Sequence, residues 1–140
     1  MRRLFLLAAS VLTLSAAQGH AASPIAGVWN LEDGGARIRI APCGRAMCGR
    51  LIAADKLRRD PQAKDSRNQD PALRGRSLRN LLVMSGFTGG PERWTGGEVY
   101  NPDDGSTYTG EMSLADADTL EVEACVLKPL CKKQTLTRVR

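Results

Sequence analysis

The residues from 27 onward form a succession of short segments in which apolar and polar side chains alternate. In the clearest case, Ala36, Ile38 and Ile40 share one face, and the two arginines between them share the other. A period of two is typical of a β-strand, because successive side chains of a strand point to opposite faces of the sheet. Such a strand is half-buried, with its apolar face in the core of the domain and its polar face in contact with solvent.

Eight segments are predicted as strands, and residues typical of turns separate most of them. They are residues 27–31, 36–41, 47–54, 77–87, 94–101, 106–115, 119–126 and 132–139. The tight connections favour an antiparallel meander, and closing a meander into a barrel removes its exposed edges. We therefore predict an all-β fold, an eight-stranded antiparallel up-and-down barrel. An open sandwich of two sheets is the alternative arrangement of the same strands.

One connection is much longer than the others. Residues 55–76 are polar and charged, and Pro61 and Pro71 interrupt them. We predict a long polar loop here, with a short helical turn at residues 71–73. Loops of this length in compact domains are usually functional or mobile.

The N-terminal residues carry the pattern of a cleaved secretory signal. Two arginines precede a nearly unbroken apolar run over residues 4–14, and small residues follow up to Ala21. Signal peptidase requires small side chains before the cut, so we predict cleavage after Ala21. The run is shorter than the roughly 20 residues that span a bilayer, and an uncleaved membrane anchor is the rival interpretation. Residues 1–21 are thus predicted as signal and residues 22–140 as one domain, periplasmic or secreted.

Cleavage restricts the functions open to the domain. Removing 21 of the 140 residues leaves 119, and the net charge falls from +5 to +3 because two arginines leave with the signal. This mild charge lacks the concentrated basic stripe of a nucleic-acid-binding protein. His20 is also removed, which excludes histidine-based catalysis, Ser-His triads and histidine metal ligands. We predict no catalytic residue and no cofactor, and a carboxylate-based hydrolase is the remaining enzymatic alternative.

The four cysteines lie in the predicted domain as two closely spaced pairs. We predict the disulfides Cys43–Cys48 and Cys125–Cys131, because an even number of cysteines in an oxidising compartment forms disulfides by default. Each closes a short loop at a hairpin end and adds roughly 2 kcal/mol in the chain-entropy model. The parity of Cys125 places the second bridge on the outer face of its strand. A zinc site made of all four thiolates is the alternative, although zinc ligands usually have closer spacing.

The two ends of the predicted barrel carry a Gly-x-Trp segment and a late arginine. Gly27, Val28 and Trp29 open the first strand, and Arg138 lies near the end of the last. These strands are neighbours in a closed barrel, so the guanidinium of Arg138 can stack on Trp29 as a structural cation–π contact. The alternative is that Arg138 is a solvated tail residue. The arrangement resembles the lipocalin and calycin signature, which implies a barrel that holds small apolar ligands.

Two arginines at the end of the long loop are candidates for ligand binding. Arg74 and Arg76 lie close to the predicted barrel mouth, and arginine forks bind carboxylate or phosphate groups. The alternative is a solvated loop in which they pair with Asp65 or Asp70. The acidic residues of this loop do not match the spacing of an EF-hand, and no metal site is predicted.

Two tyrosines complete the predicted ligand site. Tyr100 and Tyr108 lie on either side of the turn signal at residues 101–105. Their rings could pack across one hairpin or line the barrel cavity.

Five distinct segments, spread along nearly the whole predicted domain, together carry a family resemblance. They are residues 27–29, 43–52, 68–76, 94–105 and 134–139. The Asn-Pro-x-x-Gly turn at residues 101–105 and the Leu-Arg-Gly-Arg segment at residues 73–76 are the more specific of them. Together they resemble the bacterial domain-of-unknown-function family 2147. The resemblance implies an exported small β-barrel, with no established activity and no catalytic residues to transfer.

The sequence therefore favours an exported, non-enzymatic binding module of the cell envelope, for a small apolar or amphipathic ligand. The alternative is a protein-interaction or inhibitor module that binds an envelope protein through its loop rim. We expect no nucleic-acid partner and no membrane span after cleavage. The strands are short and predict a narrow barrel, and an interior filled by side chains would leave no room for an internal ligand.

Overall fold

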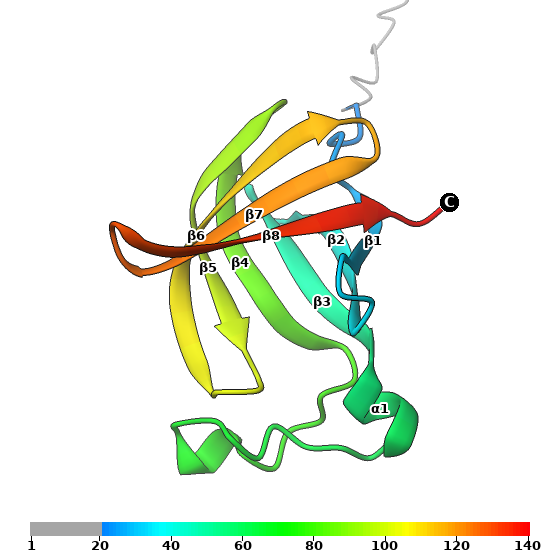
Figure 1. The fold of residues 1–140 in the computed structure, drawn as a ribbon, viewed down its shortest axis with the longest axis vertical. Coiled ribbons are helices and arrows are strands. Elements are labelled where there is room, and N and C mark those ends of the chain that lie inside the picture. The colour runs from blue at the N-terminus through cyan, green and yellow to red at the C-terminus, as the bar shows by residue number, and fades with distance from the viewer. Residues whose placement is uncertain (1–20) are drawn as a thin grey trace, which may run out of the picture.

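The computed structural model describes residues 21–140, and these residues form a closed antiparallel barrel of eight strands (Figure 1). Apart from Ala21, the predicted signal lies outside the described residues. The strands are β1 (Gly27–Leu31), β2 (Ala36–Cys43), β3 (Ala46–Ala54), β4 (Leu81–Gly89), β5 (Arg93–Asn101), β6 (Ser106–Asp116), β7 (Thr119–Leu127) and β8 (Leu130–Arg138). Each pairs with the next, and β1 pairs with β8 to close the ring. The barrel prediction is confirmed over the open sandwich.

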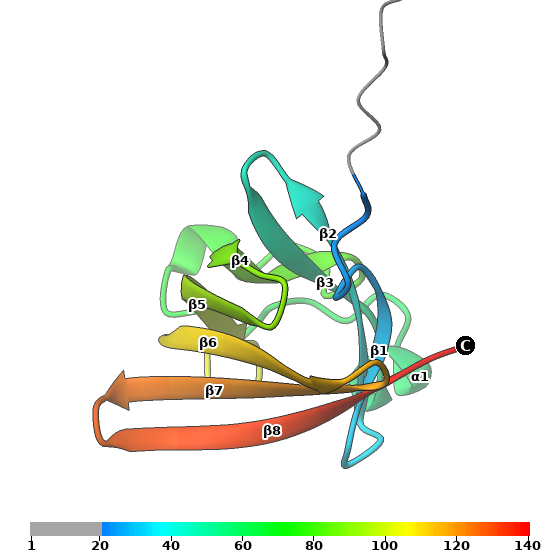
Figure 2. The same cartoon turned by 90° about the horizontal axis from the view of Figure 1, so that it is seen from above.

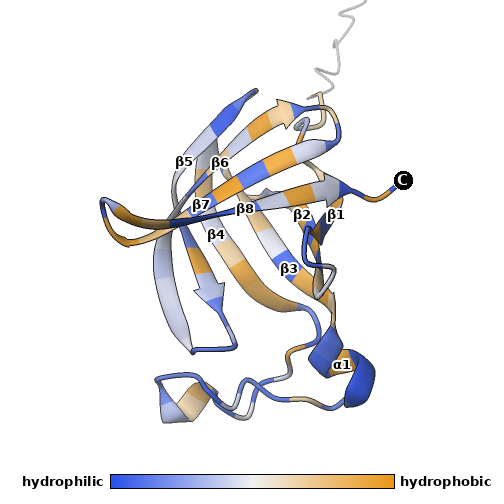
Figure 3. Cartoon of the chain, in the orientation of Figure 1, coloured by the Kyte–Doolittle hydropathy of each residue, from blue (hydrophilic) through white to orange (hydrophobic). Residues whose placement is uncertain are grey.

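The alternation of the sequence becomes an inner and an outer face of the barrel. Figure 3 shows apolar and polar residues alternating along β7 and β8. In Figure 2, the same two strands run on past the rest of the barrel as a hairpin. Within the described residues, no helix has the length and hydropathy needed to cross a membrane.

Large side chains fill the interior of the barrel. Trp29, Phe87 and Trp94 are each 0–2% exposed. Gly97 carries no side chain because the ring of Phe87 occupies its place: a Cβ at Gly97 would lie 2.4 Å from the Cγ of that ring. These buried rings take up interior space, and the two grooves described below are open to solvent.

The fourth strand is shorter than predicted, and a shift in register explains why its apolar residues do not alternate with polar ones. It begins at Leu81 and not at residue 77. Asn80, just before it, has a positive φ of 62°, and Leu78 packs into the core below. The pairing of β3 with β4 shifts register at Gly49, so Val83 and Met84 are both buried. A bulge of this kind breaks the strict alternation of a strand.

The segment between β3 and β4 covers one end of the barrel (Figure 1). It contains the helix α1 (Asp55–Arg59), which the sequence did not predict, and the 3-10 turn η1 (Pro71–Leu73), which it did. Leu57, Ala63 and Leu78 from this segment join the buried core. The segment is therefore a cap that packs on the barrel, and we call residues 55–80 the cap.

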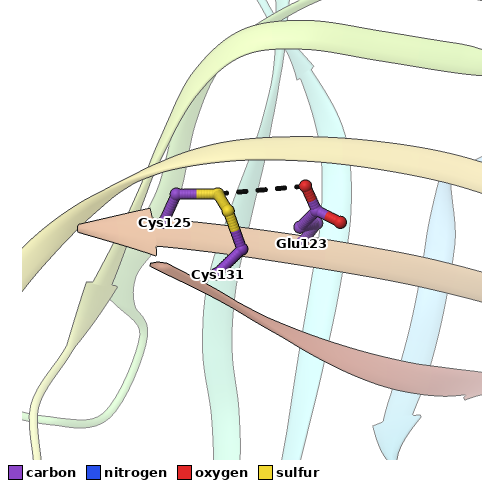
Figure 4. Close-up of side chains that lie close together, drawn as sticks. All are labelled: Glu123, Cys125 and Cys131. Carbon is purple, nitrogen blue, oxygen red and sulfur yellow. Dashed lines mark hydrogen bonds between the residues drawn. A yellow bond between two sulfur atoms is a disulfide. The ribbon is translucent and has the colours of Figure 1, made fainter. Parts of the chain in front are cut away.

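Both predicted disulfides are present, and the described residues contain no free cysteine. The Sγ of Cys125 lies 3.8 Å from a carboxylate oxygen of Glu123, beside Cys131 (Figure 4). A disulfide sulfur has no proton to donate and no charge to offer a metal ion, so this group is a covalent staple. The thiols are consumed in bridges, which rules out the four-thiolate zinc alternative. Cys125 is 6% exposed yet lies outside the core cluster.

Candidate functional site

An open groove of about 710 Å³ lies between the cap and strands β4 to β6, with Val126 of β7 at its edge. Its wall is made by Asn68, Gln69, Asp70, Leu73, Arg76, Leu82, Val83, Ser85, Glu98, Tyr100, Gly105, Ser106, Thr107, Tyr108 and Val126. The groove therefore lies beside the packed core and not within it. It collects three of the four predicted ligand residues, Arg76, Tyr100 and Tyr108.

A buried carboxylate fixes the cap to the barrel and shapes one wall of the groove. Asp65 is 0% exposed. One of its oxygens accepts a hydrogen bond from the Tyr100 hydroxyl at 2.5 Å. The other oxygen accepts hydrogen bonds from the side-chain amide of Asn68 at 2.9 Å and from the Nε of Arg76 at 2.8 Å. Burial of a carboxylate is tolerated only when it is paired and hydrogen-bonded, and these three donors meet that need.

The cap backbone continues the same arrangement. The main-chain N–H of Asp65 donates to the main-chain carbonyl of Arg76 at 3.0 Å, and the main-chain N–H of Asn68 donates to the main-chain carbonyl of Asp65 at 3.1 Å. Within residues 21–140, no buried side-chain nitrogen or oxygen lacks a hydrogen-bond partner. The groove wall is thus held by a fully satisfied polar network.

The two predicted arginines have different surroundings. The Nε of Arg74 donates to the carbonyl of Asn68 at 2.7 Å, and Arg74 does not line the groove. Arg76 lines it, pairs with Asp65, and stacks 5.2 Å from the centroid of the Tyr100 ring. The Arg76 side chain is 36% exposed, so its contacts with Asp65 and Tyr100 do not enclose it completely. The pairing of Arg76 with Asp65 is the one expected under the alternative in which the loop arginines pair with aspartates of the same loop.

The two tyrosines are not cross-strand partners. The register pairs Tyr100 with Thr107 and Tyr108 with Val99. Burial raises the pKa of Tyr100 above its ordinary value of 10.0, and the hydrogen bond to Asp65 and the charge of that carboxylate raise it further. Tyr100 therefore remains a neutral hydrogen-bond donor at physiological pH.

Tyr108 binds the carboxylate of the β5–β6 turn. Its hydroxyl donates to Asp104 at 2.5 Å, and this hydrogen bond raises the pKa of Tyr108. Desolvation alone would raise the pKa of Asp104, but the hydrogen bonds from Tyr108 and from the Ser106 amide hold it below its usual range. Asp104 thus organises this turn, which forms one edge of the groove.

Exposed apolar side chains surround the polar part of the groove. Leu73 is 39% exposed, Leu82 37% and Val126 74%. All three line the groove, and they come from the cap, β4 and β7. Thr107 supplies a hydroxyl group to the same groove. Apolar surface with a few placed polar groups is the usual character of a small-molecule site.

The barrel closure carries the predicted pair of Trp29 and Arg138. The Arg138 guanidinium lies 4.2 Å from the ring centroid of Trp29. It also donates to the carbonyls of Ala117 at 2.8 Å, Ala26 at 3.1 Å and Pro24 at 2.6 Å. A Cβ at Gly27 would lie 2.9 Å from this guanidinium, which explains the glycine two residues before the tryptophan.

A second open groove, of about 590 Å³, lies next to this closure. Arg138 and Arg140 line it, but both approach Asp118, at 3.8 and 2.6 Å. These contacts tie strand ends together and leave the cationic groups paired. The groove beside the cap is therefore the better candidate site.

Comparison with known proteins agrees with this architecture. The model of the family described as "Uncharacterized protein conserved in bacteria (DUF2147)" matches residues 27–138. The chain belongs to this family. A solved structure, the protein HP1028 from Helicobacter pylori, described as belonging to the lipocalin family, superposes with a TM-score of 0.75. It is 21% identical, and the match covers 84% of each chain. None of the curated proteins matches this sequence.

This DUF2147 domain has the lipocalin-like fold that the sequence predicted. Sequence reasoning missed Asp65 as the anchor of the cap, since its partner Tyr100 lies 35 residues away. It also missed the apolar rim at Leu73, Leu82 and Val126. A signal for the anchor was present, because Asn68 opens the family-like segment 68–76 and Asp65 lies just before it.

Proposed function

We propose that this DUF2147 domain is an exported, non-enzymatic binding module of the bacterial cell envelope that takes a small amphipathic ligand in the groove beside the cap. The observation that carries the proposal is that exposed apolar side chains and the partly exposed Arg76 line one groove of about 710 Å³. Ligand pockets generally measure about 300–1,000 Å³, so the groove has a suitable size.

The chemistry of the wall indicates how the ligand would lie. An apolar tail would contact Leu73, Leu82 and Val126, which are exposed without it. A carboxylate or hydroxyl head would reach the partly exposed Arg76. Glu98 and Asp70 also line the groove and disfavour a head with several negative charges.

Two further features support an envelope location. The N-terminal pattern is that of a secretory signal, and two disulfides link the described chain. Disulfides form and persist in oxidising compartments such as the periplasm. The described residues contain no histidine and no free cysteine, which fits a binding role better than a catalytic one.

Native mass spectrometry of protein purified from its own envelope tests this function. We expect a bound small molecule that organic extraction releases. Leu82→Glu, which places a charge on the groove rim, should lose the adduct, whereas Leu130→Glu, at an exposed leucine outside the groove, should keep it.

Other outcomes of the same experiment contradict the proposal. A Leu82→Glu protein that retains its adduct would place the ligand elsewhere. A bound protein in place of a small molecule would favour the alternative of an interaction module that acts through the loop rim. A wild-type protein with no adduct at all would remove the support for a resident ligand.

A further inference from the structure

The turn between β7 and β8 carries the three most exposed large apolar side chains of the described residues. Val126 is 74% exposed, Leu127 73% and Leu130 69%. The other exposed large apolar residues, Leu73 and Leu82, are only 39% and 37% exposed. Contiguous apolar surface on a soluble domain marks a site of contact with a protein or a membrane. We call residues 126–130 the apolar tip.

The apolar tip is held out from the body of the barrel. The hairpin of β7 and β8 projects past the neighbouring strands in Figure 2, and its end is coloured as apolar in Figure 3. The disulfide Cys125–Cys131 joins the two strands at the base of the tip. Val126, Leu127 and Leu130 thus lie within a turn that the disulfide closes, and all three remain largely exposed.

Lysines accompany the apolar tip. Lys128 lies within it, and Lys132 and Lys133 follow on β8, while residues 125–133 contain no acidic residue. Two carboxylates of the barrel wall approach these lysines: Glu111 lies 3.5 Å from Lys128, and Glu121 lies 3.4 Å from Lys133. The two lysine side chains are 68% and 55% exposed, and ion pairs with such exposed partners are weak, so the lysines remain able to bind anionic groups.

We propose that the apolar tip docks this domain onto an anionic lipid surface. Leu127 and Leu130 would enter the boundary between headgroups and acyl chains, and the lysines would lie at the level of the phosphates. The composition favours a membrane over a protein partner, because protein interfaces are depleted in lysine and enriched in aromatic residues and arginine. Lysines beside an apolar segment are typical of elements that lie in the membrane interface.

This inference does not depend on the function of the groove. Leu127 and Leu130 do not line the groove, whereas Val126 lies at its edge. Variants at Leu127 and Leu130 therefore test lipid docking without changing the groove wall, and failure of one proposal leaves the other standing.

Tryptophan fluorescence can report directly on the tip. The two native tryptophans are buried, at 0% and 2% exposure, so their emission is insensitive to vesicles. In a Leu127→Trp protein, we expect the emission to shift to shorter wavelength with phosphatidylglycerol vesicles, and to be quenched by bromine placed on the upper acyl chain. Phosphatidylcholine vesicles should give a much smaller shift, and added salt should reverse part of it.

Co-sedimentation with the same vesicles measures the contributions of apolar and charged groups. Leu127→Asn with Leu130→Asn should lower the partition coefficient at least about tenfold, since two buried side chains are lost. Lys128→Gln with Lys132→Gln should lower it roughly 25-fold, at about fivefold for each lysine. Lys56→Gln with Lys64→Gln is the matched control, because Lys56 also has a carboxylate partner, and it should change little.

Three results would overturn the proposal. The first is no binding to anionic vesicles above that to neutral ones. The second is binding that survives the Leu127→Asn and Leu130→Asn double substitution. The third is a blue shift of the Leu127→Trp protein that grows with protein concentration in the absence of lipid, which would assign the tip to contact between copies. Thermal unfolding of each variant checks that the barrel is intact, as is expected for residues so exposed.

Discussion

The contact between Arg138 and the first strand makes a sharp prediction about how the barrel is closed. The side chain is 20% exposed, stacks on Trp29 and donates to three main-chain carbonyls. Replacing Arg138 by methionine keeps much of the apolar stem and removes the guanidinium. The carbonyls of Pro24, Ala26 and Ala117 then lose a charged donor.

The expected cost follows from those contacts. A hydrogen bond contributes about 1 kcal/mol net, and a partly exposed cation–π contact contributes a similar amount. Arg138→Met should therefore lower the free energy of unfolding by about 4 kcal/mol, a large fraction of the 5–15 kcal/mol typical of a domain. For a domain of this size, that corresponds to a fall in Tm of roughly 10–20 °C.

Urea unfolding followed by far-ultraviolet circular dichroism measures the change. Arg138→Lys should lie between the wild type and Arg138→Met, because an ammonium group retains the charge but cannot reach three carbonyls at once. Arg140→Met is the control. Arg140 is also an arginine bound to Asp118, but its side chain is 76% exposed, and no measurable change is expected. An Arg138→Met protein within about 1 kcal/mol of the wild type would refute this account of barrel closure.

Three further predictions follow from the same structure. Gly97→Ala should destabilise the barrel by about 1–3 kcal/mol or more, because the new methyl group overlaps with Phe87. Gly75→Ala is the control, since open space surrounds Gly75 and no such loss is expected. Equal stabilities of the two variants in chemical denaturation would show that the ring of Phe87 does not fill the space beside Gly97. Cys125→Ser with Cys131→Ser should cost roughly 2 kcal/mol of unfolding free energy, and an unchanged urea midpoint would show that the staple contributes nothing. Because the folded-state pKa of Tyr100 is raised, the contribution of Tyr100 to stability is complete below pH 10.0 and is lost as the pH rises through the higher folded-state pKa. Tyr100→Phe should lack this loss of stability at alkaline pH. Identical stability profiles of the two proteins at alkaline pH would contradict the role of the Asp65 network.

Most of the barrel could be read from the sequence because its information is local. The alternation in β2, β6 and β7 gives the buried face of each strand directly, and Gly-x-Trp with Arg138 gives the closure. The run from Leu81 to Met84 did not alternate, and the reason is the shift in register at Gly49. That irregularity depends on the neighbouring strand β3, where Gly49 lies 35 residues before its partner Met84, and it has no local signature.

The candidate site was only partly predictable, because it depends on contacts distant in sequence. Arg76 and Tyr100 could be selected by residue type, yet the carboxylate that joins them, Asp65, resembles any loop aspartate until the fold buries it. The exposure of Leu82 likewise cannot be read from its periodicity, since most leucines in a strand are buried. Helix α1 was missed for a related reason. It is a short charged helix in which Leu57 packs into the core, and one apolar residue gives no helical periodicity in the sequence.

We propose that this lipocalin-like barrel binds its ligand in the groove beside the cap and not in its interior. The most direct measurement is a titration of the ¹⁵N-labelled protein with dodecanoate, below the concentration at which it forms micelles, followed by ¹H–¹⁵N correlation spectra. The main-chain amides of Ser85, Glu98 and Thr107, which line the groove, should shift. The indole N–H signals of Trp29 and Trp94, which report on the packed interior, should stay in place. Shifts of the two indoles with unchanged groove amides would contradict the claim and return the ligand to the inside of the barrel.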